Sequence, residues 1–345
     1  MKHALKWFDD VNGQEMPAES RIHWALYLAV GRFSSIIGLS QWQFEKEKRS
    51  IKFKLFSLAT AFSLLRLVFF SFPFILLPVI LFVTFKDKEL KCFAERNNLT
   101  LSELEYHPKQ NMLWVIHAFD YFSKYLYFIL PLVLTYNVAR PHEKLFHMAW
   151  NPYDQRVRKR LSGIGKTVIP IFGFLLFLSG KVLQTAASIL AMESVIPGIT
   201  KLPYQMYYIV GSLLLAPLSI QLYLAIQEFI FYHYCTVYHA FVSLQLQFTD
   251  GEGQDAEVHE STLQLINFME NFSQAFGPLL LMDLTLMLLY WLIHLYLAFA
   301  TLNKEGEGIL SASGSILIIG SELWRVITLT SACTNFTQVS AEVNL

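Results

Sequence analysis

Six separate stretches of this chain are each long and apolar enough to cross a lipid bilayer as a helix. A spanning helix needs about 20 mainly apolar residues, because the hydrocarbon core of a bilayer is about 30 Å thick. The stretches cover about residues 55–85, 112–138, 167–192, 204–248, 276–302 and 309–332. In lipid the backbone must satisfy its own hydrogen bonds, which favours helices. We therefore predict an all-α fold, a polytopic bundle of six transmembrane helices.

The whole chain, residues 1–345, is predicted to form one transmembrane domain. Residues 1–54 precede the first stretch, residues 55–332 hold the six-helix bundle, and residues 333–345 form a tail. The helical pattern of the fourth stretch runs for 44 residues, from Tyr204 to Gln247, which is about 66 Å as a helix. This length exceeds the bilayer core, so we expect spans four to six to have long helical extensions on one side of the membrane.

A second helical pattern begins after this long run. Gly251 and Gly253 interrupt the run, and apolar residues then recur at three-residue steps from about Val258. Such a spacing places them on one face of a helix. We expect a helix to start near Val258 and to lead towards the fifth span.

The composition excludes most classes of soluble protein. Charged residues make up only 16% of the chain, against about 25% in a typical soluble domain. Lys and Arg total 27 and Asp and Glu also total 27, so no net charge would attract nucleic acid. Three widely spaced cysteines, Cys92, Cys235 and Cys333, exclude a disulfide scaffold. We expect a multi-pass protein whose main partner is the lipid bilayer, and no nucleic-acid partner.

Positive charges between the spans predict the orientation of the bundle. The segments on the N-terminal side of the membrane carry sixteen Lys and Arg residues, whereas the loops on the other side carry seven. Cytosolic segments carry the excess of positive charge, so the N-terminus, the helical extensions and the tail are predicted to be cytosolic. Asn98 begins an Asn-Leu-Thr glycosylation sequon in the first loop, which this topology places outside the cell.

No catalytic motif is complete. Residues 163–167 resemble the end of a phosphate-binding loop, but Arg160 occupies the position of its first glycine. His142 and His147 resemble one histidine box of a membrane di-iron enzyme, which needs several such boxes to hold two irons. We expect no enzymatic activity, no cofactor and no metal ion.

Polar side chains within the apolar stretches are functional candidates, because burying them in a membrane is costly. Lys181 lies in the middle of the third stretch with no acidic residue near it in the sequence, so we expect it to face the protein interior. Asp283 lies near the cytosolic end of the fifth stretch, where it is either an interfacial or a functional residue. Glu322 and Arg325 are three residues apart and are predicted to form a local pair.

Aromatic and histidine residues gather in the predicted outer halves of spans two, four and five. Half of them are expected to form the aromatic belt of the membrane interface. The remainder, with Lys181, predict a mostly apolar cavity with a few polar groups, as is typical of small-molecule sites. The ligand-binding candidates are His117, Tyr121, Lys181, Tyr207, Tyr208, Tyr290, Trp291 and His294.

Three stretches resemble the arthropod gustatory and odorant receptor superfamily, whose members are seven-helix ligand-gated cation channels. Residues 263–281 (LQLINFMENFSQAFGPLLL) are similar to its approach to the fifth helix, residues 324–335 (WRVITLTSACTN) to the cytosolic end of its sixth, and residues 29–39 to the segment before its first. The resemblance implies a gustatory-type receptor subunit of the plasma membrane. Such a subunit would bind a small tastant or odorant and form homo- or hetero-tetramers with related subunits.

One element of the superfamily has no counterpart in this sequence. The seventh helix lines the pore and carries a Thr-Tyr pair followed by a Gln-Phe pair, but the sequence stops at Leu345, just after the sixth span. We expect a partial or truncated receptor, with a ligand cavity formed by spans one to six and no conduction of its own.

Two alternatives to a receptor channel follow from the same sequence. A G-protein-coupled receptor would need an external N-terminus, and its usual DRY and NPxxY motifs do not occur. A membrane transporter would be expected to show two related halves with broken helices, and the sequence shows no internal repeat.

Glycosylation mapping tests the predicted orientation. Expressed with microsomes, the chain should gain one endoglycosidase-sensitive sugar, because Asn98 is predicted to face the lumen. The Asn98→Gln variant should lose that sugar. A sugar at Asn271 instead would place the segment that precedes the fifth span on the lumenal side, and it would overturn the predicted orientation.

Overall fold

A computed structural model of the chain describes most of the predicted helical regions. The described residues are 18–36, 42–45, 50–53, 57–71, 140–149, 169–195, 210–247, 255–302 and 307–342. The second predicted span and the Asn98 sequon lie outside these residues. The predictions made for them therefore stay predictions.

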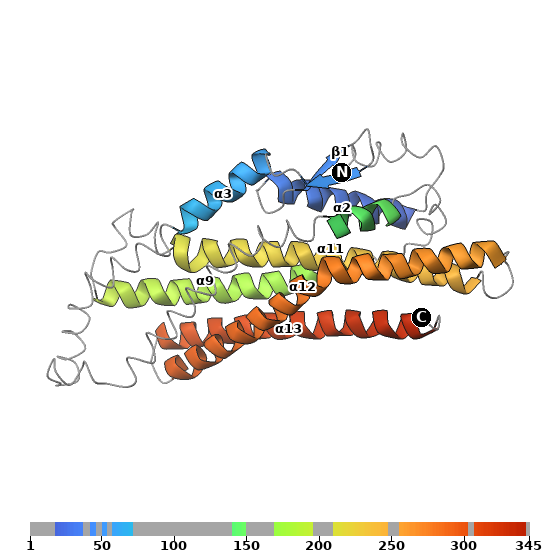
Figure 1. The fold of residues 1–345 in the computed structure, drawn as a ribbon. Coiled ribbons are helices and arrows are strands. Elements are labelled where there is room, and N and C mark those ends of the chain that lie inside the picture. The colour runs from blue at the N-terminus through green and yellow to red at the C-terminus, as the bar shows by residue number, and fades with distance from the viewer. Residues whose placement is uncertain are drawn as a thin grey trace.

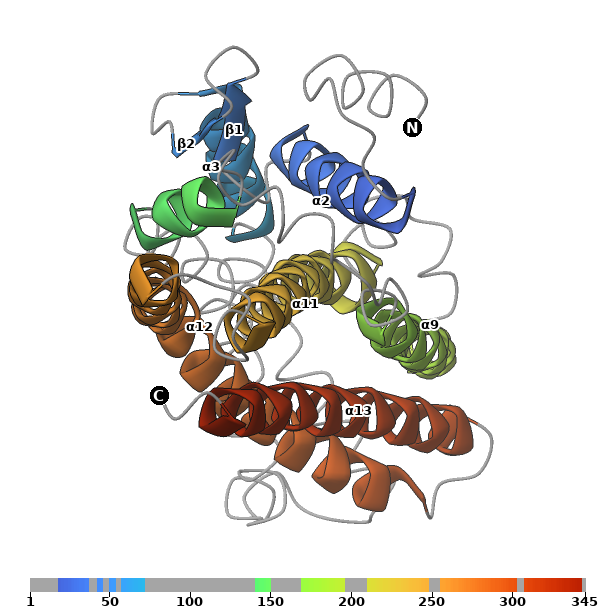
Figure 2. The same ribbon diagram turned by 90° about the vertical axis from the view of Figure 1, so that its right-hand side faces the viewer.

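The described fold is an elongated bundle of helices (Figure 1). Figure 2 looks along the bundle and shows α11 in the middle, with α2, α9, α12 and α13 around it. The helices are α2 (Ala18–Ile36), α3 (Leu58–Ser71), an unlabelled helix over residues 140–149, α9 (Ile169–Val195), α11 (Ala216–Gln247), α12 (Asp255–Leu302) and α13 (Glu307–Glu342). A π-helical turn, η4 (Gly211–Leu215), leads into α11.

Three of the described helices are long and apolar enough to cross a membrane. Their candidate spans are Ile169–Ala191 in α9, Val258–Leu302 in α12 and Gly308–Gln338 in α13. They correspond to the third, fifth and sixth predicted spans, so a helical membrane protein is supported. The number of six spans and the orientation remain predictions.

The fourth predicted span differs from these three. Residues 210–247 are helical as expected, but they are not among the candidate spans. Polar residues such as Gln221, Gln227 and Glu228 interrupt the apolar sequence of α11. Every residue from 228 to 238 is buried, so α11 is the central helix of the bundle. A helix that is covered on all sides is typical of a protein core.

The N-terminal segment is not wholly helical. Residues Trp42–Glu45 (β1) and Ser50–Phe53 (β2) form an antiparallel ribbon in which Trp42 lies opposite Phe53. The sequence of β1 alternates apolar and polar residues, a strand pattern, and Ile51 of β2 joins the buried core. The all-α fold class holds for the bundle, and this short ribbon is an addition that the sequence analysis did not predict.

Aromatic contacts attach α2 to the central helix. The hydroxyls of Tyr27 and Tyr234 lie 3.0 Å apart, and the rings of His23 and His233 stack with their centres 4.5 Å apart. Burial lowers the pKa of His23 to about 4, so its ring is uncharged at neutral pH. The N-terminal segment is thus packed against α11.

One continuous helix joins the predicted helix near Val258 to the fifth span. The structure places both in α12, which begins at Asp255 and is 48 residues long. Figure 1 shows that α12 changes direction along its length, and Pro278 lies inside it. Proline removes a backbone hydrogen bond and bends a helix, so Pro278 accounts for the bend.

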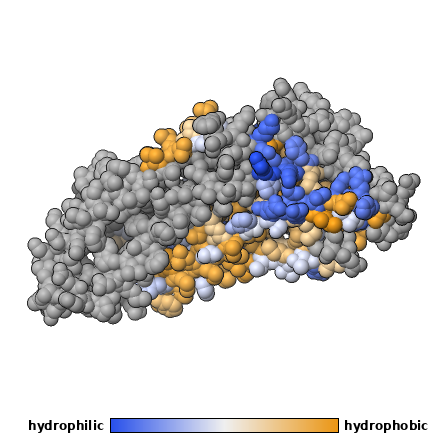
Figure 3. All heavy atoms as spheres, in the orientation of Figure 1, coloured by the Kyte–Doolittle hydropathy of each residue, from blue (hydrophilic) through white to orange (hydrophobic). Residues whose placement is uncertain are grey.

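An apolar face covers part of α9, α12 and α13. Figure 3 shows hydrophobic residues gathered along the lower side of the bundle, with hydrophilic residues towards its right-hand end. The exposed apolar side chains include Ile171, Leu175, Leu281, Leu288, Phe299, Ile316 and Leu323. An apolar surface this continuous is typical of contact with lipid.

Two glycines allow α9 and α13 to cross closely. A Cβ atom added to Gly180 would lie 2.7 Å from the carbonyl oxygen of Gly314, and a Cβ added to Gly314 would lie equally close to the carbonyl oxygen of Gly180. Small residues at such crossings let backbones approach each other, which is a common way to pack helices in membranes.

Replacing Gly180 by alanine should force α9 and α13 apart. We expect Gly180→Ala to destabilise the protein by about 1–3 kcal/mol, the usual cost of overpacking, measured as a lower thermal unfolding midpoint in detergent. Gly320→Ala on α13 is the control, because a Cβ added there meets nothing within 4 Å. It should be neutral or stabilising, since alanine favours a helix more than glycine does. Equal effects of both variants would contradict the close crossing.

Candidate functional site

Four of the eight predicted ligand-binding residues lie in the described part of the chain. Lys181 is on α9, and Tyr290, Trp291 and His294 are on α12. The other four candidates and the glycosylation candidate lie outside the described residues: His117, Tyr121, Tyr207, Tyr208 and Asn98.

Lys181, Tyr290 and His294 lie together between α9 and α12. The Nζ atom of Lys181 is 3.5 Å from Nε2 of His294 and 5.4 Å from the centre of the Tyr290 ring. Only 4% of Lys181 is exposed, so the prediction that it faces the protein interior is confirmed. We call these three residues, together with Gln184 and Ser315, the Lys181 cluster.

Trp291 does not join the Lys181 cluster. It follows Tyr290 directly, so its side chain leaves the helix in a different direction. Its exposed fraction is 37%, whereas Tyr290 is buried. An outward-facing tryptophan of this kind is typical of the membrane interface rather than of an enclosed site.

Gln184 links the three helices of the Lys181 cluster. Its Oε1 accepts a 3.1 Å hydrogen bond from Lys181, and its Nε2 donates to Ser315 Oγ of α13 at 2.8 Å. The same Nε2 lies 3.1 Å from Nδ1 of His294. An amide nitrogen can only donate, so Nδ1 accepts this bond and a neutral His294 carries its hydrogen on Nε2.

This tautomer places two donors face to face. Nε2–H of His294 and the ammonium of Lys181 are 3.5 Å apart, and neither atom can accept a hydrogen bond in these forms. Both are therefore suited to share an acceptor oxygen. The cluster lies beside the rings of Tyr290 and Phe177, which are 5.4 and 5.6 Å from Lys181 Nζ.

The close crossing of α9 and α13 positions this cluster. Gly180 directly precedes Lys181, and Gly314 directly precedes Ser315. Because the two glycines let the backbones meet, Gln184 reaches Ser315 across the crossing. On each of the two helices, the glycine that allows the close crossing is thus followed directly by a residue of the Lys181 cluster.

A second polar group, which the sequence did not reveal, is centred on Arg325. The predicted local pair forms, since Nη1 of Arg325 lies 2.8 Å from Oε2 of Glu322. The same guanidinium also contacts Glu228 of α11 through Nε at 2.5 Å and Asp283 of α12 through Nη2 at 2.8 and 2.9 Å. We call these four residues, with Gln221, the Arg325 network.

The Arg325 network is buried between α11, α12 and α13. Only 3% of Arg325 is exposed, and its three acidic partners are buried as well. Gln221 of α11 donates a 2.6 Å hydrogen bond to Oε1 of Glu322. Asp283 is therefore an interior residue and not an interfacial one.

Sequence reasoning missed Glu228 because no local signal marks it. Its neighbours Phe229, Ile230 and Phe231 are apolar, and its nearest basic partner in the structure is 97 positions away. A single acidic residue within an apolar run was the available sign, and the sequence analysis did not use it.

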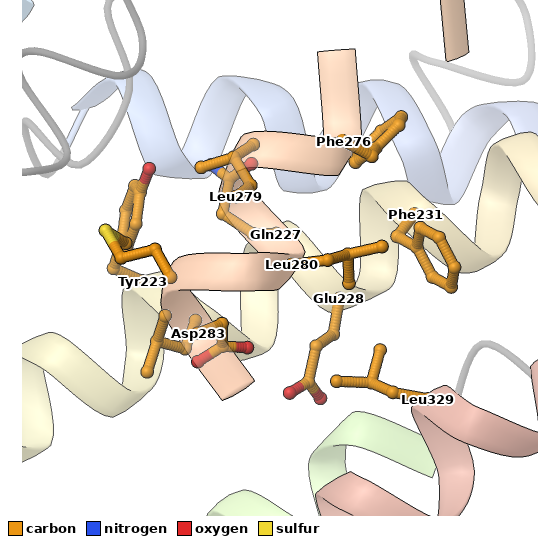
Figure 4. A pocket seen from close by; sticks show the side chains of 11 residues that line it. Tyr223, Gln227, Glu228, Phe231, Phe276, Leu279, Leu280, Asp283 and Leu329 are labelled. Carbon is orange, nitrogen blue, oxygen red and sulfur yellow. The ribbon is translucent and has the colours of Figure 1, made fainter. Parts of the chain in front are cut away.

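A small cavity lies beside the Arg325 network. Figure 4 shows Glu228 and Asp283 at its wall, with Phe231, Phe276 and Leu329 around them. Its volume is about 20 Å³, which is room for one water molecule. This space is too small for a tastant, so it does not match the predicted ligand cavity.

The two histidines of the incomplete histidine box face different surroundings. His142 is buried against Tyr234, with ring centres 5.3 Å apart, whereas His147 is exposed. Burial lowers the pKa of His142 to about 4. Among the described residues, no group of three His, Cys, Asp or Glu side chains is arranged to hold a metal ion.

Comparisons with known proteins give no further assignment. No protein-family model, no curated protein and no solved structure matches this chain.

Proposed function

We propose that this chain is a subunit of a chemosensory, gustatory-type receptor that acts as a ligand-gated cation channel of the plasma membrane. The observation that carries the proposal is the Lys181 cluster, a set of charged and polar groups buried among apolar helices. Ionisable residues in such a place are functional candidates by default. The sequence resemblance to the gustatory and odorant receptor superfamily gives the cluster its proposed role.

The ligand of such a receptor would be a small molecule with an acceptor oxygen and an apolar body. An oxygen between Lys181 Nζ and His294 Nε2 would accept hydrogen bonds from both. The rings of Phe177 and Tyr290 would contact the apolar part of the molecule. Few polar groups in a mainly apolar surrounding are typical of small-molecule sites.

Binding at this place would alter helix packing. The cluster takes side chains from α9, α12 and α13, and a ligand that enters it must move Lys181 and His294 apart. A ligand stabilises the arrangement that it binds best, so movement of these helices would be the signal passed to a pore. As the resemblance implies, the pore would form in a tetramer with copies of this chain or related subunits.

Electrical recordings with a lysine variant test the proposed function. The full chain, co-expressed with related receptor subunits, should give cation currents in response to members of a tastant panel. Lys181→Met should raise the half-maximal ligand concentration by about tenfold or more, since a charged hydrogen bond contributes about 1.5–3 kcal/mol.

The matched control is Lys144→Met, because Lys144 is exposed on the helix over residues 140–149. Lys144→Met should leave the ligand response unchanged. Surface biotinylation should show equal amounts of the wild type, Lys181→Met and Lys144→Met at the cell surface. An unchanged response in Lys181→Met would contradict the site. A parallel loss of surface protein and current would assign Lys181 a folding role instead.

A further inference from the structure

The Arg325 network contains more acidic than basic groups. Its three carboxyl groups, from Glu228, Asp283 and Glu322, surround one guanidinium. If all three were ionised, the network would carry two excess negative charges in a buried place. Buried carboxyl groups that share a site resist full ionisation, because like charges repel and the charged form loses its hydration.

The three carboxyl groups differ in how well their oxygens are satisfied. Both carboxyl oxygens of Asp283 accept a hydrogen bond from Nη2 of Arg325. One oxygen of Glu322 accepts a hydrogen bond from Arg325, and its other oxygen accepts one from Gln221. Within the described residues, Glu228 receives a hydrogen bond on Oε1 from Arg325. Hydrogen bonds to both oxygens stabilise a carboxylate, which favours ionised Asp283 and Glu322.

Glu228 also has space for a protonated oxygen. It lines the cavity of about 20 Å³ between α11 and α12 (Figure 4). The cavity leaves room beside Glu228 for the added hydrogen of a protonated carboxyl group. Besides Arg325, the charged and titratable groups around Glu228 are Asp283 of α12, Glu322 of α13, and Tyr223 and Tyr232 of α11 itself.

We propose that the Arg325 network holds a proton on Glu228 at neutral pH, and that this proton makes the packing of α11 against α12 and α13 sensitive to pH. Release of the proton leaves a third carboxylate beside Asp283 and Glu322, whose repulsion loosens the contact of the three helices. Uptake of one proton restores the hydrogen-bonded arrangement. This inference does not depend on the proposed receptor function.

Infrared spectroscopy of the full chain in lipid nanodiscs tests the inference directly. A protonated carboxyl group has a C=O stretching band that a carboxylate lacks. The wild-type protein should show this band at neutral pH and lose it reversibly as the pH is raised. E228Q should lack the band, whereas the control E270Q, which changes an exposed glutamate of α12, should keep it. A wild-type spectrum without the band at neutral pH would overturn the inference.

Two further measurements complete the test, and the first of them does not require E228Q to fold. E322Q removes one carboxylate that repels a charge on Glu228, so it should keep a band that disappears at a lower pH than in the wild type. A band that is absent in E322Q from neutral to mildly acidic pH would assign the proton to Glu322 and overturn the assignment to Glu228. A folded state that binds more protons than the unfolded chain loses stability as the pH rises. The thermal midpoint of the wild type should therefore fall towards alkaline pH, and that of folded E228Q should fall less. Equal slopes in both proteins would contradict a proton on Glu228.

Discussion

The contact between one guanidinium and three carboxyl groups from three helices is the interaction on which the packing of this bundle depends. Arg325 carries five N–H groups in a fixed plane, and its nitrogens donate hydrogen bonds to Glu228, Asp283 and Glu322. Removing one partner of a buried ion pair costs about 3–5 kcal/mol, because the remaining charge stays buried. This cost favours the arrangement of α11, α12 and α13 in which all three carboxyl groups contact Arg325.

The second set of contacts depends on backbone approach rather than on charge. Gly180 and Gly314 bring α9 and α13 together, and the residues beside them, Lys181 and Ser315, become members of one buried cluster. α13 therefore contributes to both polar groups, with Ser315 in the Lys181 cluster and Arg325 in its network.

The sequence predicted the helices better than their contacts. Long apolar stretches identify α9, the second part of α12 and α13, because a bilayer requires helices of that length. The interior position of Lys181 followed from the cost of a charge in lipid. The strands β1 and β2 were missed because four-residue segments give weak periodic signals. The Arg325 network was missed because Asp283 and Glu228 lie 42 and 97 positions from Arg325. Spacing along the chain does not show which helix faces meet, and it revealed the local partner Glu322 alone.

A double-mutant cycle between Arg325 and Asp283 tests the central claim most directly. Thermal unfolding in nanodiscs would compare the wild type, Arg325→Met, Asp283→Leu and the double variant. If the two side chains are in contact, Arg325→Met should cost at least about 1 kcal/mol less when Asp283 is already replaced, because fewer carboxylates are then left without a cation. An equal cost of Arg325→Met in both backgrounds would contradict the contact and with it the proposed joining of α12 to α13.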